Sequence, residues 1–99
     1  VRDPGRLGRL ASAVPAPLRD SVRGASVAIV VCAAPGRISR KDLGIPFSAI
    51  DVPNALVHLL LAAAERGLPC AWTLDVGQEE CRRELSIPGD VRVTAVVAL

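Results

Sequence analysis

Apolar residues recur at helical spacing in residues 4–14, so this segment is predicted to be an α-helix. The apolar positions come every three or four residues, as they do on one face of a helix. They are Leu7, Leu10, Ala11 and Val14. Asp3 in front of Pro4 suits the start, because an aspartate side chain caps a first turn and proline is accepted within it. Pro15 ends the helix, and a second short helix is predicted over residues 18–23.

Two stretches are apolar without alternation, which predicts strands covered on both faces. Residues 26–34 are one of them, rich in β-branched side chains, and we predict a central strand there. Residues 91–99 are the other. They begin by alternating and end wholly apolar, so this strand should run into the middle of a sheet. Between them, residues 69–74 form a short extended segment and residues 77–85 a helix with acids in its first turn.

The longest predicted helix runs from Asp51 to Arg66 and ends before Gly67. Its side chains are apolar almost all round, and a helix of that kind is buried on most sides. Polar side chains form one narrow stripe along it, which faces either solvent or a polar seam. The stripe consists of Asp51, Asn54, His58 and Glu65.

The predicted elements occur in the order helix, helix, strand, loop, helix, strand, helix, strand. Residues 35–50 are the loop, because glycine and proline punctuate them, and a loop of this length is often functional or interfacial. The sequence therefore predicts one α/β (α+β) domain over residues 1–99, with a three-stranded core sheet and a long buried central helix.

The composition adds an expected partner to this picture. The chain has 99 residues, 51% of them hydrophobic and 22% charged, which fits one globular domain. Phe47 and Trp72 are its only aromatic residues, so small side chains must fill the core. So large an apolar fraction on so short a chain indicates that another subunit covers part of the apolar surface. The net charge of +2 is spread along the chain, so a nucleic-acid partner is not expected.

Catalytic and metal-binding motifs are scarce. The sequence has neither a G-x-S-x-G nucleophile elbow nor a glycine-rich phosphate loop. Its single histidine, His58, is either a structural residue or a candidate for proton transfer. The spacing of Cys32, Cys70 and Cys81 suits neither zinc nor disulfides, so we expect no metal site and reduced core cysteines in a cytoplasmic protein. The apolar run over residues 55–64 is too short to span a membrane.

The order of several short motifs resembles the C-terminal half of the nitroreductase family of flavoproteins. Residues 51–72 (DVPNALVHLLLAAAERGLPCAW) are similar to that family's long helix and the extended segment after it. LSIPGD at residues 85–90 and VRVTAVVAL at residues 91–99 are similar to its turn and closing strand. Upstream, residues 2–11 and 26–34 resemble the helix and strand that precede them. The resemblance implies a truncated nitroreductase-like fold.

The resemblance also implies where a flavin and a partner would lie. In the family, the turn after the long helix lies against the FMN ring, and the long helices meet in the interface between subunits. The positions that match the turn are Trp72, Thr73, Leu74 and Asp75. The positions expected in the interface are Asn54, Leu56 and Leu60. His58 is the candidate catalytic residue.

The family's basic segments that hold the flavin phosphate have no counterpart in residues 1–99. FMN is therefore expected to be held mainly by a larger nitroreductase-like chain in an obligate oligomer, and this chain is not expected to be active alone. Two-component cyclodipeptide oxidases, which desaturate cyclic dipeptides, combine such a flavoprotein with a small subunit, which this chain resembles in size. Two alternatives stay open: a structural or interaction subunit without a catalytic part, and a fragment of a full-length nitroreductase.

Overall fold

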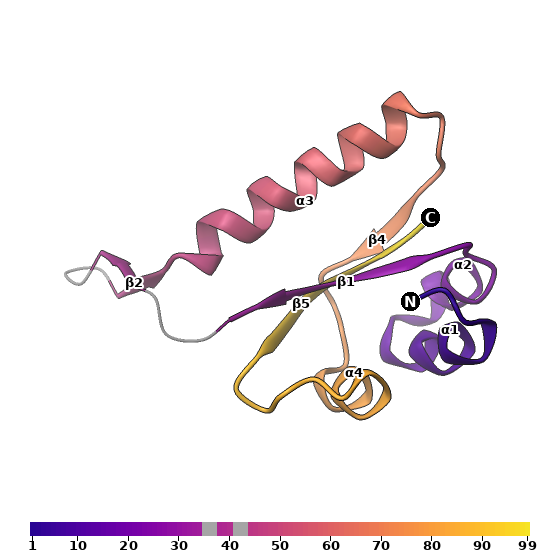
Figure 1. Cartoon of the computed structure of the whole chain (residues 1–99), viewed down its shortest axis with the longest axis horizontal. Helices are drawn as coiled ribbons and strands as arrows, with labels where there is room; N and C mark the ends of the chain where they lie inside the picture. Colours follow the sequence, from indigo (N-terminus) through magenta and orange to yellow (C-terminus); the bar gives the residue numbers. More distant parts are fainter. Residues whose placement is uncertain (35–37, 41–43) are drawn as a thin grey trace.

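A three-stranded antiparallel sheet separates two layers of helices in this protein (Figure 1). The computed structural model describes residues 1–34, 38–40 and 44–99. The strands of the sheet are β1 (Ala28–Ala33), β4 (Ala71–Thr73) and β5 (Arg92–Ala98), in the order β1-β5-β4. Short helices lie on one side of the sheet, and a single long helix lies on the other.

The N-terminal helices pack on the first side of the sheet. Helix α1 (Pro4–Leu10) starts as predicted, because the Asp3 carboxylate accepts a hydrogen bond of 2.8 Å from the backbone N–H of Arg6. The chain continues through η1 (Ala11–Ala13) and η2 (Ala16–Leu18) into α2 (Arg19–Arg23). The two helices expected in this region are therefore confirmed, and Pro15 lies at the break between them.

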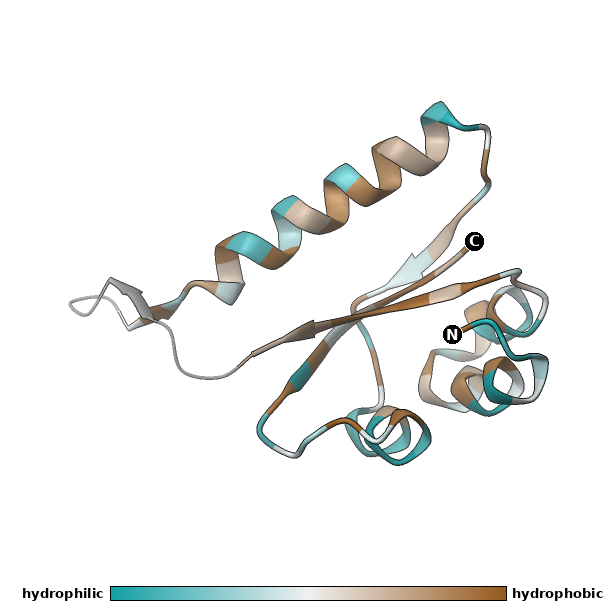
Figure 2. Cartoon of the chain, viewed as in Figure 1, coloured by the Kyte–Doolittle hydropathy of each residue, from teal (hydrophilic) through white to brown (hydrophobic). Residues whose placement is uncertain are grey.

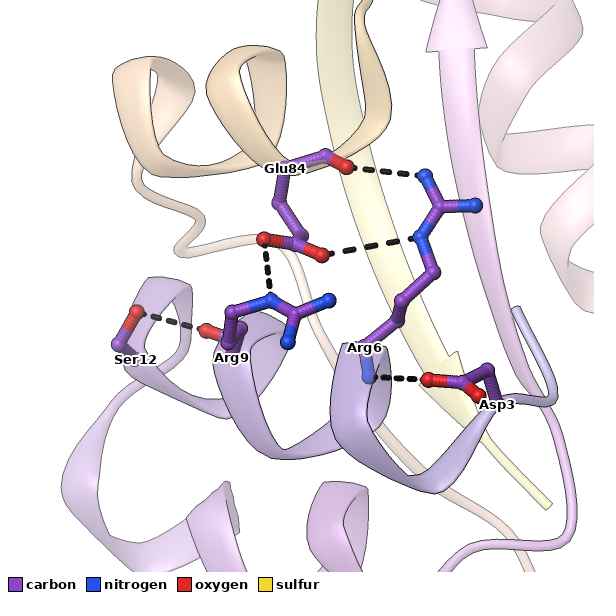
Figure 3. A network of polar contacts seen from close by, with 5 residues as sticks. All are labelled: Asp3, Arg6, Arg9, Ser12 and Glu84. Carbon is purple, nitrogen blue, oxygen red and sulfur yellow. Dashed lines mark hydrogen bonds and ion pairs between the residues drawn. The ribbon is translucent and has the colours of Figure 1, made fainter.

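Helix α4 (Gln78–Leu85) completes this layer and is tied to α1 through Glu84 (Figure 3). Arg9 Nε donates to a carboxylate oxygen of Glu84 at 2.9 Å, and Arg6 Nη2 donates to the backbone oxygen of Glu84 at 2.9 Å. The larger core cluster lies between these helices and the sheet. Its most deeply buried large side chains are Leu7, Leu10, Cys81, Val93 and Val96.

Strand β5 is the central strand, with β1 on one side of it and β4 on the other. The prediction that residues 91–99 run into the middle of a sheet is therefore confirmed. The prediction of a central strand over residues 26–34 is wrong, because β1 pairs with β5 alone among the described strands. Its middle residues, Ile29, Val30 and Val31, are accordingly only half-buried. An apolar run shows that both faces of a strand can be buried, but it does not show whether the strand pairs with one neighbouring strand or with two.

Helix α3 (Ser48–Glu65) is the long helix of the second layer, and it begins three residues before the predicted start at Asp51. Its last residue is Glu65, one before the predicted end at Arg66, and Gly67 follows with a left-handed φ of 67°. The backbone N–H of Leu68 then donates to the carbonyl of Ala63 at 3.0 Å, as in a glycine-terminated helix end.

The expectation that this helix is buried on most sides is wrong. Leu56 and Ala63 are the buried side chains of α3, whose residues are all described. Leu56 forms a second, smaller core cluster with Ala95 and Val97 of β5. In Figure 2, hydrophobic segments recur along α3 between hydrophilic ones, and the sheet lies along one side of the helix only. Val52, Leu59, Leu60 and Ala62 are half-buried, and the other apolar side chains of α3 are exposed within this chain.

Residues 35–50, predicted to be an irregular loop, contain a short hairpin and the start of α3. Strands β2 (Ile38–Arg40) and β3 (Ile45–Pro46) pair antiparallel, and they lie beyond the N-terminal end of α3, away from the main sheet (Figure 1). The parts of the predicted loop at residues 35–37 and 41–43 lie outside the described residues.

Candidate functional site

Residues 72–75 comprise the last two residues of β4 and the turn that follows this strand. Trp72 lies opposite Val97 of β5, so its side chain is on the α3 side of the sheet, and it is 45% exposed. Thr73 fixes the turn that follows. Its Oγ1 accepts a hydrogen bond from the backbone N–H of Asp75 at 3.0 Å and donates to the carbonyl of Asp75 at 3.3 Å. Leu74, between them, is 61% exposed.

An open groove of about 530 Å³ lies between this turn, the first turns of α3 and the near end of β5. The turn contributes Leu74 and Asp75, α3 contributes Ser48 and Val52, and β5 contributes Arg92. The groove therefore combines apolar walls with a basic and an acidic side chain. Two of the four residues that the resemblance singles out, Leu74 and Asp75, line the groove, because β4 runs antiparallel to β5 and ends toward the Arg92 end of that strand.

Two further polar residues of the groove are already engaged in holding the fold. The side-chain amide of Gln78 donates to the carbonyl of Val93 at 2.6 Å and accepts from its N–H at 2.9 Å. The hydroxyl of Thr94 donates to the carbonyl of Val31 at 2.9 Å. These bonds hold both side chains in place, so the Gln78 amide and the Thr94 hydroxyl support the wall of the groove.

The described residues do not fit a complete FMN site. A flavin needs a surface for its ring and several cationic or N–H donors for its phosphate. Trp72 and Leu74 offer exposed apolar surface, which suits contact with a ring. Arg92 is the one basic side chain among the residues that line the groove, and the N–H of Asp75 is taken by Thr73. This part of the chain can therefore contact a flavin ring, while the phosphate would have to be held elsewhere.

His58 lies on the exposed side of α3 and is not among the residues that line the groove. Its Nδ1 is 2.7 Å from the backbone oxygen of Asn54, so the tautomer that carries a proton on Nδ1 can donate to that carbonyl. The four residues of the predicted polar stripe are all exposed, so within this chain the stripe faces solvent. The catalytic role of His58 stays a prediction.

The three residues expected at an interface have different surroundings. Leu56 is only 5% exposed and packs against the sheet of its own chain, so its side chain is not at the surface. Leu60 is half-buried and Asn54 is exposed. The sequence reasoning missed the most exposed large apolar residues of the helix, which are Ile50, Val57 and Leu61. Their separations of seven and four residues are the signal that could have found them.

The cysteines were expected in the core, and the structure bears this out for one of them. Cys81 is buried, Cys70 is half-buried and Cys32 is exposed, because it lies in an edge strand. Burial raises the pKa of the Cys81 thiol to about 11. Within the described ranges, no group of three His, Cys, Asp or Glu side chains could hold a metal ion. None of the described helices has the length and apolar character needed to cross a membrane.

The sequence matches no family model and no curated protein. Solved structures do match. A nitroreductase family protein from Clostridium novyi NT superimposes with a TM-score of 0.83 at 24% identity, over 98% of this chain and 56% of that protein. Another, from Clostridium difficile 630, has a TM-score of 0.81 at 23% identity, over 99% of this chain and 54% of that protein. This chain therefore has the fold of nitroreductase family proteins over little more than half of their length.

Proposed function

We propose that this chain is a subunit of a hetero-oligomeric FMN-dependent oxidoreductase, paired with a longer nitroreductase-like chain that holds most of the flavin. The observation that carries the proposal is the incomplete site at residues 72–75. It offers an exposed indole and leucine for ring contact, next to a groove with one basic side chain, Arg92. Such a surface suits a chain that completes another protein's flavin site.

The exposed apolar surface supports the partner in this proposal. Trp72, Leu74, Val57 and Leu61 are each between 45% and 63% exposed. Large apolar side chains this exposed on a small protein suit contact with another chain. Because this chain has a nitroreductase-like fold, a longer protein of related fold is the natural candidate for the partner that covers this apolar surface.

The substrate we propose is a cyclic dipeptide, which the assembled enzyme would dehydrogenate. Support for this substrate comes from the arrangement that the resemblance implies, because two-component cyclodipeptide oxidases pair a nitroreductase-like flavoprotein with a small subunit of about the length of this chain. A second candidate function, a structural subunit without a part in catalysis, is favoured by His58. Its Nδ1 is engaged with a carbonyl of its own helix, which is typical of a structural histidine.

Co-expression with the nitroreductase-like flavoproteins of the same organism tests the proposal. We expect the chain alone to be colourless when it is mixed with FMN and then separated by gel filtration, and a co-purified complex to carry bound flavin with its yellow absorbance. A stoichiometrically yellow chain on its own would contradict the proposal. An open reading frame that continues in frame into the missing part of the fold would instead make this chain a segment of a full-length nitroreductase.

A pair of substitutions separates the catalytic from the structural reading. Trp72→Ala removes the side chain that we expect against the ring, and Leu68→Ala removes a side chain of similar exposure, 47%, that lies outside the turn. If the chain contributes to the flavin site, Trp72→Ala lowers turnover of the assembled complex while Leu68→Ala does not. If both complexes turn over normally, the structural reading holds.

A further inference from the structure

Helix α3 carries an exposed apolar seam with coiled-coil spacing. The seam positions are separated alternately by four and three residues, and they are Ile50, Asn54, Val57, Leu61 and Ala64. At 100° per residue they fall within about 80° of one another, so they form one stripe along the helix. Ile50, Val57 and Leu61 are 50%, 53% and 63% exposed. The stripe points away from Leu56 and Ala63, the two side chains that α3 buries against its own chain.

One edge of this seam is acidic and the other is apolar. Asp51, His58 and Glu65 follow the seam at intervals of seven residues, each directly after a seam position, and all three are exposed. Pro53 and Leu60 occupy the opposite edge. The acidic edge thus occupies the heptad positions that flank the seam, and coiled-coil helices select their partners by the charges at these positions.

Arg66 leaves the seam-facing side of the acidic edge without a cation from α3 itself. Its Nη1 lies 3.9 Å from a Glu65 carboxylate oxygen, a loose pair between two exposed side chains. The same Nη1 donates to the carbonyl of Ala62 at 3.1 Å, and Ala62 lies about 100° around the helix from Leu61. The guanidinium is therefore held on the side of Glu65 that faces away from the seam.

We propose that this seam is the docking face for a helix of the partner chain that has apolar residues at the same spacing and Lys or Arg along the flank that meets Asp51 and Glu65. The inference rests on the proposed function and names the chemistry of the partner at this face. The seam spans about 21 Å from Ile50 to Ala64 at 1.5 Å per residue, which is two heptads. Asn54 at a seam position would help to set the register, as a single polar residue does in paired helices.

The charge pattern argues against a second copy of this chain as the occupant. In an antiparallel pair of identical helices, Asp51 of one copy would meet Glu65 of the other, and like charges would face each other with His58 in the middle. In a parallel pair, the acidic edge would meet the other edge of the second copy, which carries Pro53 and Leu60 and offers no cation. A partner with a basic flank satisfies the acids in either orientation.

Two synthetic helical peptides test the seam directly. They share leucines at the four-three spacing and differ only in carrying Lys or Glu at the flanking positions. Titrated into the ¹⁵N-labelled chain, the Lys peptide should shift the amide signals of Ile50, Val57 and Leu61 and should saturate at about tenfold lower concentration than the Glu peptide. The double variant Asp51→Lys with Glu65→Lys should reverse this preference.

Three results would overturn the proposal: equal saturation by the two peptides, no shifts along the seam, or seam shifts that depend on the concentration of the chain alone. The last result would identify a second copy as the occupant. Circular dichroism of the double variant, whose changes are at exposed positions, checks that its helix content is unchanged.

The co-expressed complex separates this proposal from the proposed function. Leu61→Glu places a charge on the seam, and Ala55→Glu places the same charge on an exposed position off the seam. We expect Leu61→Glu to weaken the complex with the flavoprotein at least tenfold and Ala55→Glu to leave it intact. If the complex tolerates Leu61→Glu, the docking proposal is overturned while the proposed function stands. If no complex with a flavoprotein forms but the Lys peptide is still preferred, the proposed function is overturned while the docking proposal stands.

Discussion

The side-chain amide of Gln78 pairs with the backbone of Val93 as a neighbouring strand would. Gln78 Nε2 donates to the Val93 carbonyl at 2.6 Å, and Gln78 Oε1 accepts from the Val93 N–H at 2.9 Å. Strand β4 pairs with β5 only as far as Val96, so it does not reach Val93. On the side of β5 that β4 leaves unpaired, Gln78, the first residue of α4, therefore takes up the backbone hydrogen bonds of Val93. The same bonds anchor α4 beside the groove.

Gln78→Ala should lower the free energy of unfolding by about 1–3 kcal/mol, because it leaves a part-buried N–H and C=O of Val93 without their partners. Gln78→Glu should be destabilising as well, since its carboxylate can still accept from the N–H but sets a second acceptor oxygen against the Val93 carbonyl. Urea unfolding followed by circular dichroism measures both. Arg83→Ala, an exposed change on the same helix, is the control and should fall within about 0.5 kcal/mol of the wild type. If Gln78→Ala is as stable as the wild type, water replaces the hydrogen bonds of the amide without loss of folding free energy.

The contact between Arg9 and Glu84 should make stability depend on acid pH. The hydrogen bond from Arg9 lowers the pKa of the Glu84 carboxyl from its ordinary value of 4.5. A carboxyl whose pKa is lower in the folded than in the unfolded chain stabilises the fold above its ordinary pKa, and this contribution is lost as the pH falls through the folded value.

Thermal unfolding of Glu84→Gln tests this dependence on pH. The variant should unfold at a lower temperature than the wild type near neutral pH, and the gap should close as the pH falls below about 4. Asp20→Asn is the control, since the Asp20 side chain is 96% exposed and should show little gap at any pH. A gap for Glu84→Gln that stays the same down to pH ~2 would show that the lost charge is not its cause.

Cys81 should resist thiol reagents while the chain is folded. Its side chain is fully buried, and burial raises the pKa of its thiol to about 11, so the reactive thiolate is scarce at neutral pH. Cys32 is exposed and should be labelled first, although desolvation raises the pKa of its thiol too. Mass spectrometry after iodoacetamide treatment, with and without urea, distinguishes the sites. Labelling of Cys81 as fast as Cys32 in the native state would mean that α4 opens readily.

Two leucines on α3 should respond very differently to the same substitution. Leu56→Ala empties a site that is 5% exposed between α3 and β5, and it should cost about 2–5 kcal/mol. Leu61→Ala changes a side chain that is 63% exposed and should stay within about 0.5 kcal/mol of the wild type. Guanidinium unfolding of the isolated chain compares them. Equal losses would indicate that the Leu61 face is already covered in the isolated chain.

Local signals in the sequence were enough to predict most element types and ends. Asp3 before Pro4 marked the start of α1, and Gly67 marked the end of α3, because capping and left-handed backbone depend on residues next to each other. The extended segment predicted over residues 69–74 contains β4, and the flavin contact that the resemblance implies for residues 72–75 stays a prediction. The hairpin of β2 and β3 was missed, since its strands are too short to show a period.

By itself, the sequence determined that this chain forms short helices, three strands of one sheet and one long apolar helix, because spacing, caps and breakers act locally. Only the tertiary structure decided that β5 rather than β1 is central, and that α3 covers the sheet with Leu56 while Val57 and Leu61 stay exposed. It also decided that Gln78 completes the edge at Val93. Which apolar face of a helix is buried depends on what packs against it. The sequence shows the same apolar spacing whether that face packs against its own chain or against another chain.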